Sequence, residues 1–208
     1  MYARTTTVKG DPQALEKGVA QVRDEVLPAV EQMDGCTGLS MLADREYGTC
    51  IVTTAWETEQ ALAASRERVR ALRSRAVEAL RAGSEPEVRE WEIAVVHRAH
   101  AVNDGACARV TWLQVDADRV DRQLDIYRST VLPRLESMTG FCSASLLIDR
   151  ASGRAAGALI LDSRKALEDS REMARSIRTQ ATRETGAQIV DVAEFDVVLA
   201  HLRVPETV

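Results

Sequence analysis

The sequence lacks the motifs that mark the common cofactor and metal sites. Its four cysteines never form a C-x-x-C pair, so neither a zinc site nor a thioredoxin-like dithiol is predicted. It has no G-x-G-x-x-G and no phosphate-binding loop, so nothing indicates a flavin or a nucleotide. No acidic residue lies at metal-ligand spacing from the paired histidines described below. We therefore expect no cofactor and no metal.

Long apolar runs and excess positive charge are also absent. No stretch approaches the roughly 20 apolar residues that cross a bilayer, and the N-terminal residues do not have the pattern of a signal peptide. The net charge of −5 argues against a nucleic-acid-binding protein that relies on bulk positive charge. We therefore expect a cytoplasmic globular protein that binds neither membranes nor nucleic acid.

The sequence repeats itself with an offset of 105 residues. The phrase VLPAVEQMDG at 26–35 returns as VLPRLESMTG at 131–140 (131 − 26 = 105). The same offset pairs Arg4 with Arg109, Thr6 with Thr111, Asp11 with Asp116, Gly48 with Gly153 and Ser65 with Ser170. Matches that run through a whole half of the chain indicate a tandem duplication.

The offset falls to 104 near the end of each half, where Glu90 pairs with Glu194. One deletion in a loop explains this change. We predict one repeat at 1–98 and a second at 107–204. The small and polar segment 99–106 contains an Asn-Asp-Gly turn signal and is the predicted linker.

Each half has the pattern strand–helix–strand–strand–helix–strand. The first helix of each half keeps its apolar residues at helical spacing on both sides of a proline, Pro28 or Pro133. Proline removes a backbone hydrogen bond and bends a helix, so we predict a kink at each proline and a helix that continues beyond it. The second helix is predicted at about 59–82 and again at about 163–185.

The order βαββαβ is the ferredoxin-like plan, which places both helices on one face of a sheet. The other face is left bare and must be covered. We therefore predict an α+β fold in which two ferredoxin-like βαββαβ repeats bring their sheets face to face and form an intramolecular dimeric α/β barrel.

Three segments resemble the antibiotic biosynthesis monooxygenase (ABM) domains of the dimeric α/β-barrel superfamily. They are the helix exits MDGCTG and MTGFCS, the hairpin that follows, and TTAWETEQALAASRE at 53–67. The resemblance covers nearly all of both halves. It implies cofactor-independent oxygenases of bacterial secondary or stress metabolism, haem-degrading enzymes, or domains without known activity. The family barrel is usually a homodimer, so this tandem is expected to be a monomer with an internal pseudo-dimer, or a homodimer.

The haem-degrading branch of this family resembles the chain at Trp56. That branch needs an axial histidine about nine residues further on, where this chain has Ser65, and an asparagine in the first strand, where it has Ala3 or Arg4. Leu161 replaces the tryptophan in the second repeat. Without an imidazole to hold the iron, haem degradation is not expected.

The first and last strands of each repeat carry the candidate polar site. Strand alternation places Arg4 and Thr6 on one face, near Glu92 or Glu90 of the neighbouring strand. The second repeat offers Arg109 and Thr111 beside Asp196 or Glu194. We expect these residues on the face away from the helices. There the arginines and threonines would bind an anionic or enolised substrate, and Glu92 or Asp196 would act as the base if burial raised its pKa. The alternative is a structural arginine–carboxylate pair between strands.

His97 and His201 form a matched pair that could act as a base near neutral pH, or serve as structural histidines at strand ends. Trp91, Val95 and His97 alternate along the last strand of the first repeat and therefore lie on the same face of the sheet. We expect this apolar face to lie under the helices. Trp56, at a strand–helix junction, is the aromatic residue predicted at a ligand pocket, with core packing as the alternative.

Two functions from different classes remain open, and the sequence leaves undecided whether the protein is an enzyme. One is an ABM-like, cofactor-independent oxygenase that acts on a small molecule. The other is a non-catalytic ligand-binding or structural barrel. A closed cavity with a titratable group reaching into it favours the enzyme, whereas a fully packed interior favours the scaffold. If only one repeat has a cavity, the other repeat is structural support.

Overall fold

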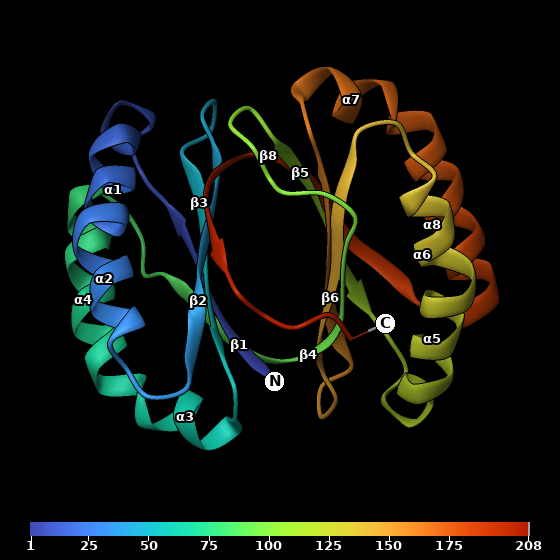
Figure 1. Ribbon diagram of the computed structural model, residues 1–208, viewed down its shortest axis with the longest axis horizontal. Helices are drawn as coiled ribbons and strands as arrows, with labels where there is room; N and C mark the ends of the chain where they lie inside the picture. Colours follow the sequence, from blue (N-terminus) through green and yellow to red (C-terminus); the bar gives the residue numbers. More distant parts are fainter. Residues whose placement is uncertain (208) are drawn as a thin grey trace. The chain divides into compact units, whose positions relative to one another are not determined.

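The computed structural model describes residues 1–207, and its elements follow the same order in each half (Figure 1). The first half contains β1 (Tyr2–Lys9), η1 (Pro12–Ala14), α1 (Leu15–Gln21), η2 (Val22–Val26), α2 (Leu27–Glu31), β2 (Cys36–Asp44), β3 (Thr49–Trp56), α3 (Glu59–Ala64), α4 (Arg66–Ala79) and β4 (Glu87–Arg98). The second contains β5 (Cys107–Gln114), η3 (Ala117–Arg119), α5 (Val120–Ile126), η4 (Tyr127–Val131), α6 (Leu132–Glu136), β6 (Phe141–Asp149), β7 (Arg154–Leu161), α7 (Arg164–Asp169), α8 (Arg171–Thr185) and β8 (Gln188–Leu202). The predicted βαββαβ pattern of each repeat is confirmed.

The strands are hydrogen-bonded in the closed order β1-β3-β2-β8-β5-β7-β6-β4, which is the topology of an eight-stranded barrel. The pairs β1–β3, β2–β3, β2–β8, β4–β6, β5–β7 and β6–β7 are antiparallel. The predicted fold class, an α+β intramolecular dimeric α/β barrel, is confirmed by this order.

The chain divides into two compact units that differ from the sequence repeats at their last strands. The first unit contains Met1–Trp91 and Asp196–Val204, and the second contains Glu92–Phe195 and the residues from Pro205 onward. Strands β4 and β8 are therefore each shared, with one part of the strand in each unit. In each unit, helices pack on one face of the sheet (Figure 1).

A β-bulge in β4 changes which side its residues face. The register with β6 shifts between Ile93 and Val95, and one extra residue reverses the alternation beyond it. Val95 packs in the helix-covered core of the second unit. The indole of Trp91, before the bulge, donates to the Thr5 hydroxyl at 2.8 Å. Thr5 neighbours Arg4, which bonds to the helices, so the expectation that Trp91 lies under the helices is wrong.

The proline in the first helix of each repeat follows a π-helical turn. Leu27 N–H donates to Val22 O, and Leu132 N–H donates to Tyr127 O, so each bond spans five residues. This wider turn accommodates the ring and the missing N–H of the next residue, Pro28 or Pro133. The residues that flank the turn keep right-handed helical angles, so the helix continues across the proline as predicted.

Each unit has its own apolar core between its sheet and its helices. The second helical segment of each repeat is interrupted at a buried serine, Ser65 or Ser170, whose hydroxyl donates to a carbonyl three residues earlier at 2.7 Å.

Within residues 1–207, no helix has the length and apolar character needed to span a bilayer.

Candidate functional site

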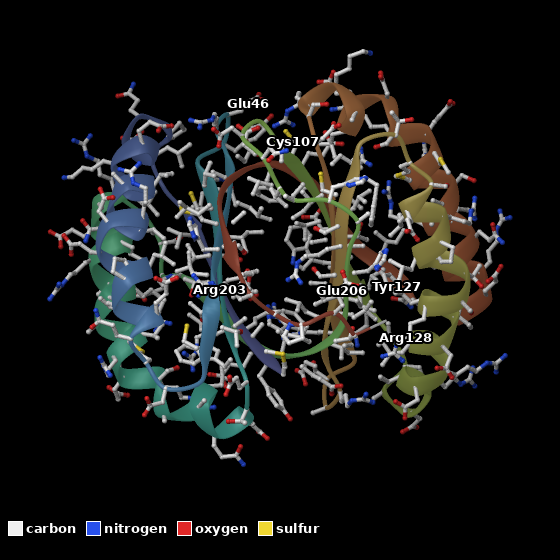
Figure 2. All side chains as sticks on the ribbon, in the orientation of Figure 1. Glu46, Cys107, Tyr127, Arg128, Arg203 and Glu206 are labelled. Atoms are coloured by element: carbon white, nitrogen blue, oxygen red, sulfur yellow. The ribbon has the colours of Figure 1, made fainter. Side chains whose placement is uncertain are left out.

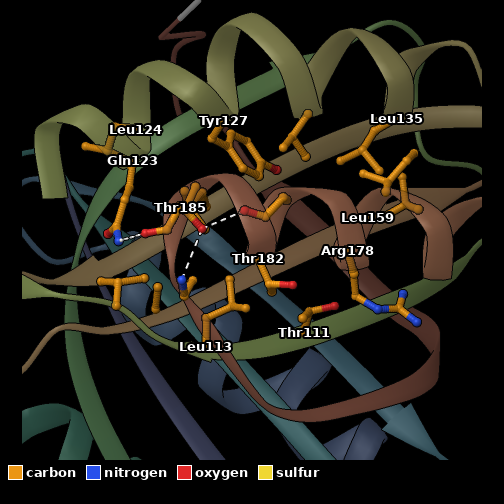
Figure 3. A pocket seen from close by; sticks show the side chains of 18 of the residues that line it. Thr111, Leu113, Gln123, Leu124, Tyr127, Leu135, Leu159, Arg178, Thr182 and Thr185 are labelled. Carbon is orange, nitrogen blue, oxygen red and sulfur yellow. Dashed lines mark hydrogen bonds between the residues drawn. The ribbon is translucent and has the colours of Figure 1, made fainter. Parts of the chain in front are cut away.

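A cavity lies in the second unit between the sheet and its helices (Figure 3). It has a volume of about 120 Å³ and is lined by residues of β5, β6, β7, α5, η4 and α8. Most of the lining consists of leucine, valine, isoleucine and alanine side chains. An engineered apolar cavity of about 150 Å³ admits benzene, so this space fits a slender ligand with roughly the width of one aromatic ring.

Gln123 lies at one end of the cavity, where Figure 3 shows it beside Thr185. Its side-chain Nε2 donates to the Thr185 carbonyl at 3.0 Å. Its Oε1 has no hydrogen-bond partner within residues 1–207, although Gln123 is only 8% exposed. A buried acceptor without a partner costs about 1–3 kcal/mol, so this oxygen is well placed to accept a hydrogen bond from a ligand.

Tyr127 projects from the π-helical turn η4 into the cavity (Figure 3). Burial raises the pKa of its phenol well above the ordinary value, so the hydroxyl stays protonated and can donate a hydrogen bond. Figure 2 shows Tyr127 and its neighbour Arg128 on the same helical segment. Arg128 instead donates to the Ala94 carbonyl at 3.0 Å.

Two arginines, Arg109 and Arg178, also line the cavity, and Figure 3 shows Arg178 at the end away from Gln123. Arg109 is 3% exposed and fully engaged: it donates to Leu167 O at 2.7 Å, Ser170 Oγ at 2.9 Å and Glu194 Oε1 at 2.8 Å. Arg178 makes no hydrogen bond or ion pair with any residue in the range 1–207. Partial burial, and next the charge of Arg109, lower the pKa of its guanidinium, which still remains charged near neutral pH.

Leu80 fills the matching corner of the first unit. Leu80 is 1% exposed and packs directly on Gly18, where an added Cβ would lie 2.2 Å from its Cδ2. Leu80 O also accepts from Asp11 N–H at 2.9 Å. This approach requires Gly10, because a Cβ there would lie 2.6 Å from Leu80 O.

The second repeat has Val115, Gln123 and Thr185 at the positions of Gly10, Gly18 and Leu80. Each of these three differences prevents the tight packing seen in the first unit, and together they leave the corner open. The floor differs as well. Gly157 replaces Val52, and an added Cβ at Gly157 would meet Leu146 at 3.7 Å, which is an ordinary contact distance.

The predicted substrate-binding residues are divided between the two units. Arg109 and Thr111 line the cavity, whereas Arg4 and Thr6 are buried in the first unit. Arg4 donates to Leu62 O at 2.7 Å, so it faces the helices. The expectation that the arginines point away from the helices is therefore wrong: strand alternation gives the residues that share a face, but not which face the helices cover.

The two first-strand arginines make matching ion-pair networks. Arg4 binds Glu90, which also binds Arg66, and both hydrogen bonds lower the pKa of Glu90. At Glu194, burial acts to raise the carboxyl pKa, but hydrogen bonds from Arg171 and Arg109 outweigh it and lower the pKa. Both carboxylates therefore stay ionised and hold the last strand to a helix and to the first strand.

The four predicted catalytic residues lie outside the cavity lining. Glu92 pairs with Arg150 at 2.6 Å and Asp196 pairs with Arg45 at 2.9 Å, both at the surface. His201 is exposed.

His97 stacks on Phe141 with ring centroids 5.9 Å apart. Its Nε2 lies 3.3 Å from Glu136 Oε1, and its Nδ1 lies 3.7 Å from Glu206 Oε2. Neither nitrogen has hydrogen-bond geometry with a partner in the described chain. These contacts become ion pairs only when the ring is protonated. Within the second unit, His97 and Glu92 therefore contact different partners.

Trp56 is fully buried in the core of the first unit, and its Nε1 donates to Thr54 Oγ1 at 3.1 Å. Sequence reasoning missed Gln123, Tyr127, Arg178 and Thr185 as lining residues. Two of these residues could have been found by comparing the repeats, because Gln123 and Thr185 stand where the first repeat has Gly18 and Leu80.

Comparisons with known proteins agree with this fold. A family model described as "Antibiotic biosynthesis monooxygenase" (ABM) matches residues 1–82. The uncharacterized protein Rv2557 of Mycobacterium tuberculosis is 49% identical over all 208 residues, which span 92% of its length.

Two solved structures share the fold at low sequence identity. An anthrone oxidase-like protein has a TM-score of 0.66 and 15% identity, covering 95% of this chain and 91% of its own. LmHde, a heme-degrading enzyme from Listeria monocytogenes, has a TM-score of 0.50 and 10% identity, covering 93% and 97%. The family-model match, the relative of 49% identity and the duplicated βαββαβ pattern show that the chain belongs to the antibiotic biosynthesis monooxygenase family.

Proposed function

We propose that the protein is a cofactor-independent oxygenase that binds a small, ionisable apolar molecule in the cavity of the second unit. The observation that carries this proposal is the cavity itself: an apolar space with a phenol, an arginine and an unpaired amide oxygen on its lining. The filled corner beside Leu80 makes the first unit a structural support in this proposal.

In such a reaction the substrate supplies the electrons. A substrate carbanion transfers electrons to O₂, its CH₂ carbon becomes a carbonyl, and the second oxygen atom leaves as water. The Arg178 guanidinium favours the ionised form of a bound acid, because an opposite charge nearby stabilises an anion. The protonated Tyr127 hydroxyl can donate a hydrogen bond to a substrate oxygen as negative charge develops there.

The alternative is ligand binding without turnover, and one observation favours it. No carboxylate or imidazole is found among the described residues that line the cavity, so a general base of ordinary type is missing there. An oxygenase at this site therefore requires a substrate acidic enough to ionise without such a base.

Haem degradation fits these residues poorly. Ser65 stands where the haem-degrading branch has its axial histidine, and it is buried with its hydroxyl engaged. It accepts from Arg4 Nη1 at 2.8 Å and donates to Leu62 O at 2.7 Å. The position therefore serves the ion-pair network of the first unit.

Oxygen uptake with a cavity-filling variant tests the proposal. We expect the protein to consume oxygen with single-ring compounds that carry an acidic CH₂ group, and Gly157→Val to abolish both uptake and binding because it fills the cavity floor as Val52 does. Gly83→Ala is the control, since an added Cβ there has nothing within 4 Å. Binding without uptake supports the non-catalytic alternative. Equal uptake by Gly157→Val and the parent protein contradicts the proposed site.

A further inference from the structure

We infer that the ligand of the second-unit cavity is an elongated amphipathic acid, with its anionic group at Arg178 and a hydrogen-bond donor at Gln123. This inference rests on the proposed binding site and names the class of molecule that the site selects.

The anionic end follows from the environment of Arg178. Its side chain is half-buried, borders the cavity, and has no hydrogen-bond or ion-pair partner within residues 1–207. The nearest acid of the network, Glu194, is already held by Arg109 and Arg171 at 2.8 and 2.7 Å. The charge of Glu194 favours protonated Arg178, but Glu194 makes its direct bonds with two other arginines, so a carboxylate or enolate arriving from the cavity would give Arg178 a direct ion-pair partner.

The donor end follows from Gln123. Its amide is oriented by the bond from Nε2 to Thr185 O, which leaves Oε1 as an acceptor in the cavity wall. The hydroxyl of Thr185 is already engaged, because it donates to Ala181 O at 2.7 Å and accepts from Ala187 N–H at 3.1 Å. A ligand group at this end must therefore donate a hydrogen bond, as a hydroxyl or an N–H does.

The helix sets the length of the ligand. Thr185, which holds Gln123, follows Arg178 by seven residues in α8, or about 10 Å at 1.5 Å per residue. Between the two ends the lining is apolar, with Leu124, Leu159 and Ile177 among its residues. The cavity therefore selects a narrow apolar body of about 10 Å, which excludes short hydrophilic acids.

The first unit provides an internal control for this reasoning. Arg73 occupies the position of Arg178, is also half-buried, and has no hydrogen bond or ion pair within the described chain. Its corner is filled by Leu80 on Gly18, with Val52 on the floor. An unpaired arginine alone is thus a property of both repeats, whereas the open apolar space beside it is specific to the second.

Calorimetric titration with three matched probes tests the inference. The probes are 4-hydroxycinnamate, its methyl ester, and cinnamate, which lacks the hydroxyl. We expect the acid to bind the unmodified protein at least tenfold more tightly than the ester, and at least threefold more tightly than cinnamate. Arg178→Gln should remove the preference for acid over ester, and Gln123→Leu should remove the preference for the hydroxyl. Arg73→Gln should change neither preference.

Several results would overturn the inference. Equal affinity of the unmodified protein for acid and ester contradicts the anionic end, and this comparison needs no variant. An equal loss of acid and ester affinity in Arg178→Gln assigns that arginine a structural role. If neutral single-ring phenols bind and Gly157→Val abolishes their binding while all three acids fail, the proposed cavity stands and the inference fails. If neither neutral nor acidic probes bind, both fail.

Discussion

The two repeats share an arginine network and differ in the packing beside it. Arg4 and Arg109 each contact a buried serine, a helix carbonyl and a glutamate, at distances that agree within 0.1 Å. At the neighbouring corner, Leu80 packs on Gly18 in the first repeat, whereas Gln123 and Thr185 border a cavity in the second. The network therefore belongs to the framework of the fold, and the corner is where the halves have diverged.

In the proposed function, this divergence separates ligand binding in the second repeat from structural support in the first. The first repeat, which the family model matches, has its helix–sheet space filled and contributes stability. The second repeat gives up some packing, because Gly157 and Thr185 are smaller than Val52 and Leu80. A cavity reduces stability in proportion to its size, so a filled partner in the same chain can offset that cost.

The largest expected effect tests what the repeats share. Arg4→Ala and Arg109→Ala should each lower the free energy of unfolding by about 3 kcal/mol, because each leaves a helix carbonyl and a serine without a partner and weakens a glutamate pair. Urea unfolding, followed by circular dichroism, measures both. Arg68→Ala is the control, since Arg68 is exposed.

The losses of unfolding free energy in Arg4→Ala and Arg109→Ala are then compared, because their difference shows whether the two arginines have the same role. Similar losses in both repeats confirm that the network is structural in each. A loss below 1 kcal/mol in Arg109→Ala, together with abolished ligand binding, would instead show that the second arginine serves the ligand.

Sequence patterns predicted the fold because they reflect local rules. The apolar helix faces and the proline within a continuing helix each depend on residues close in sequence, and the offset of 105 residues shows the same local pattern twice. Each of these features matches the structure. The pairing of Arg4 with Glu90 could also be predicted. The first and last strands are neighbours, and strand alternation leaves few carboxylates that can face Arg4.

The site was harder to predict because it depends on three-dimensional packing. Alternation could not tell which face of the sheet the helices cover, and the bulge at Ile93–Val95 reversed the alternation within β4. Tyr127 has the spacing of a core residue, and only the space around it makes it a lining residue. A cavity is an absence of contacts between distant segments, which no local pattern records.

A smaller effect tests what the repeats do not share. Leu80→Thr gives the first repeat the residue of the second and should lower the free energy of unfolding by about 2–3 kcal/mol, because it removes a fully buried side chain that packs on Gly18. Urea unfolding measures the loss, with Leu72→Thr as a less buried control.

The stoichiometry of binding sharpens this test. If the open corner alone makes a site, calorimetry on Leu80→Thr should show a second, weaker site for 4-hydroxycinnamate. A single site in Leu80→Thr would show that Gln123 and Gly157 are needed as well as the space.

The smallest expected effect concerns the end of the second long helix in each repeat. Arg81 and Gly186 occupy matching positions with left-handed φ values of 51° and 74°. Gly186→Ala should lower the free energy of unfolding by about 1 kcal/mol, since an L-residue is strained there and an added Cβ meets nothing within 4 Å. Arg81→Ala should change it by less than about 0.5 kcal/mol, because both residues carry the same strain and the ion pair to Asp11, at 3.6 Å, is exposed. Equal losses in the two variants would mean that the Arg81 side chain stabilises its helix end by as much as the strain that Gly186→Ala adds.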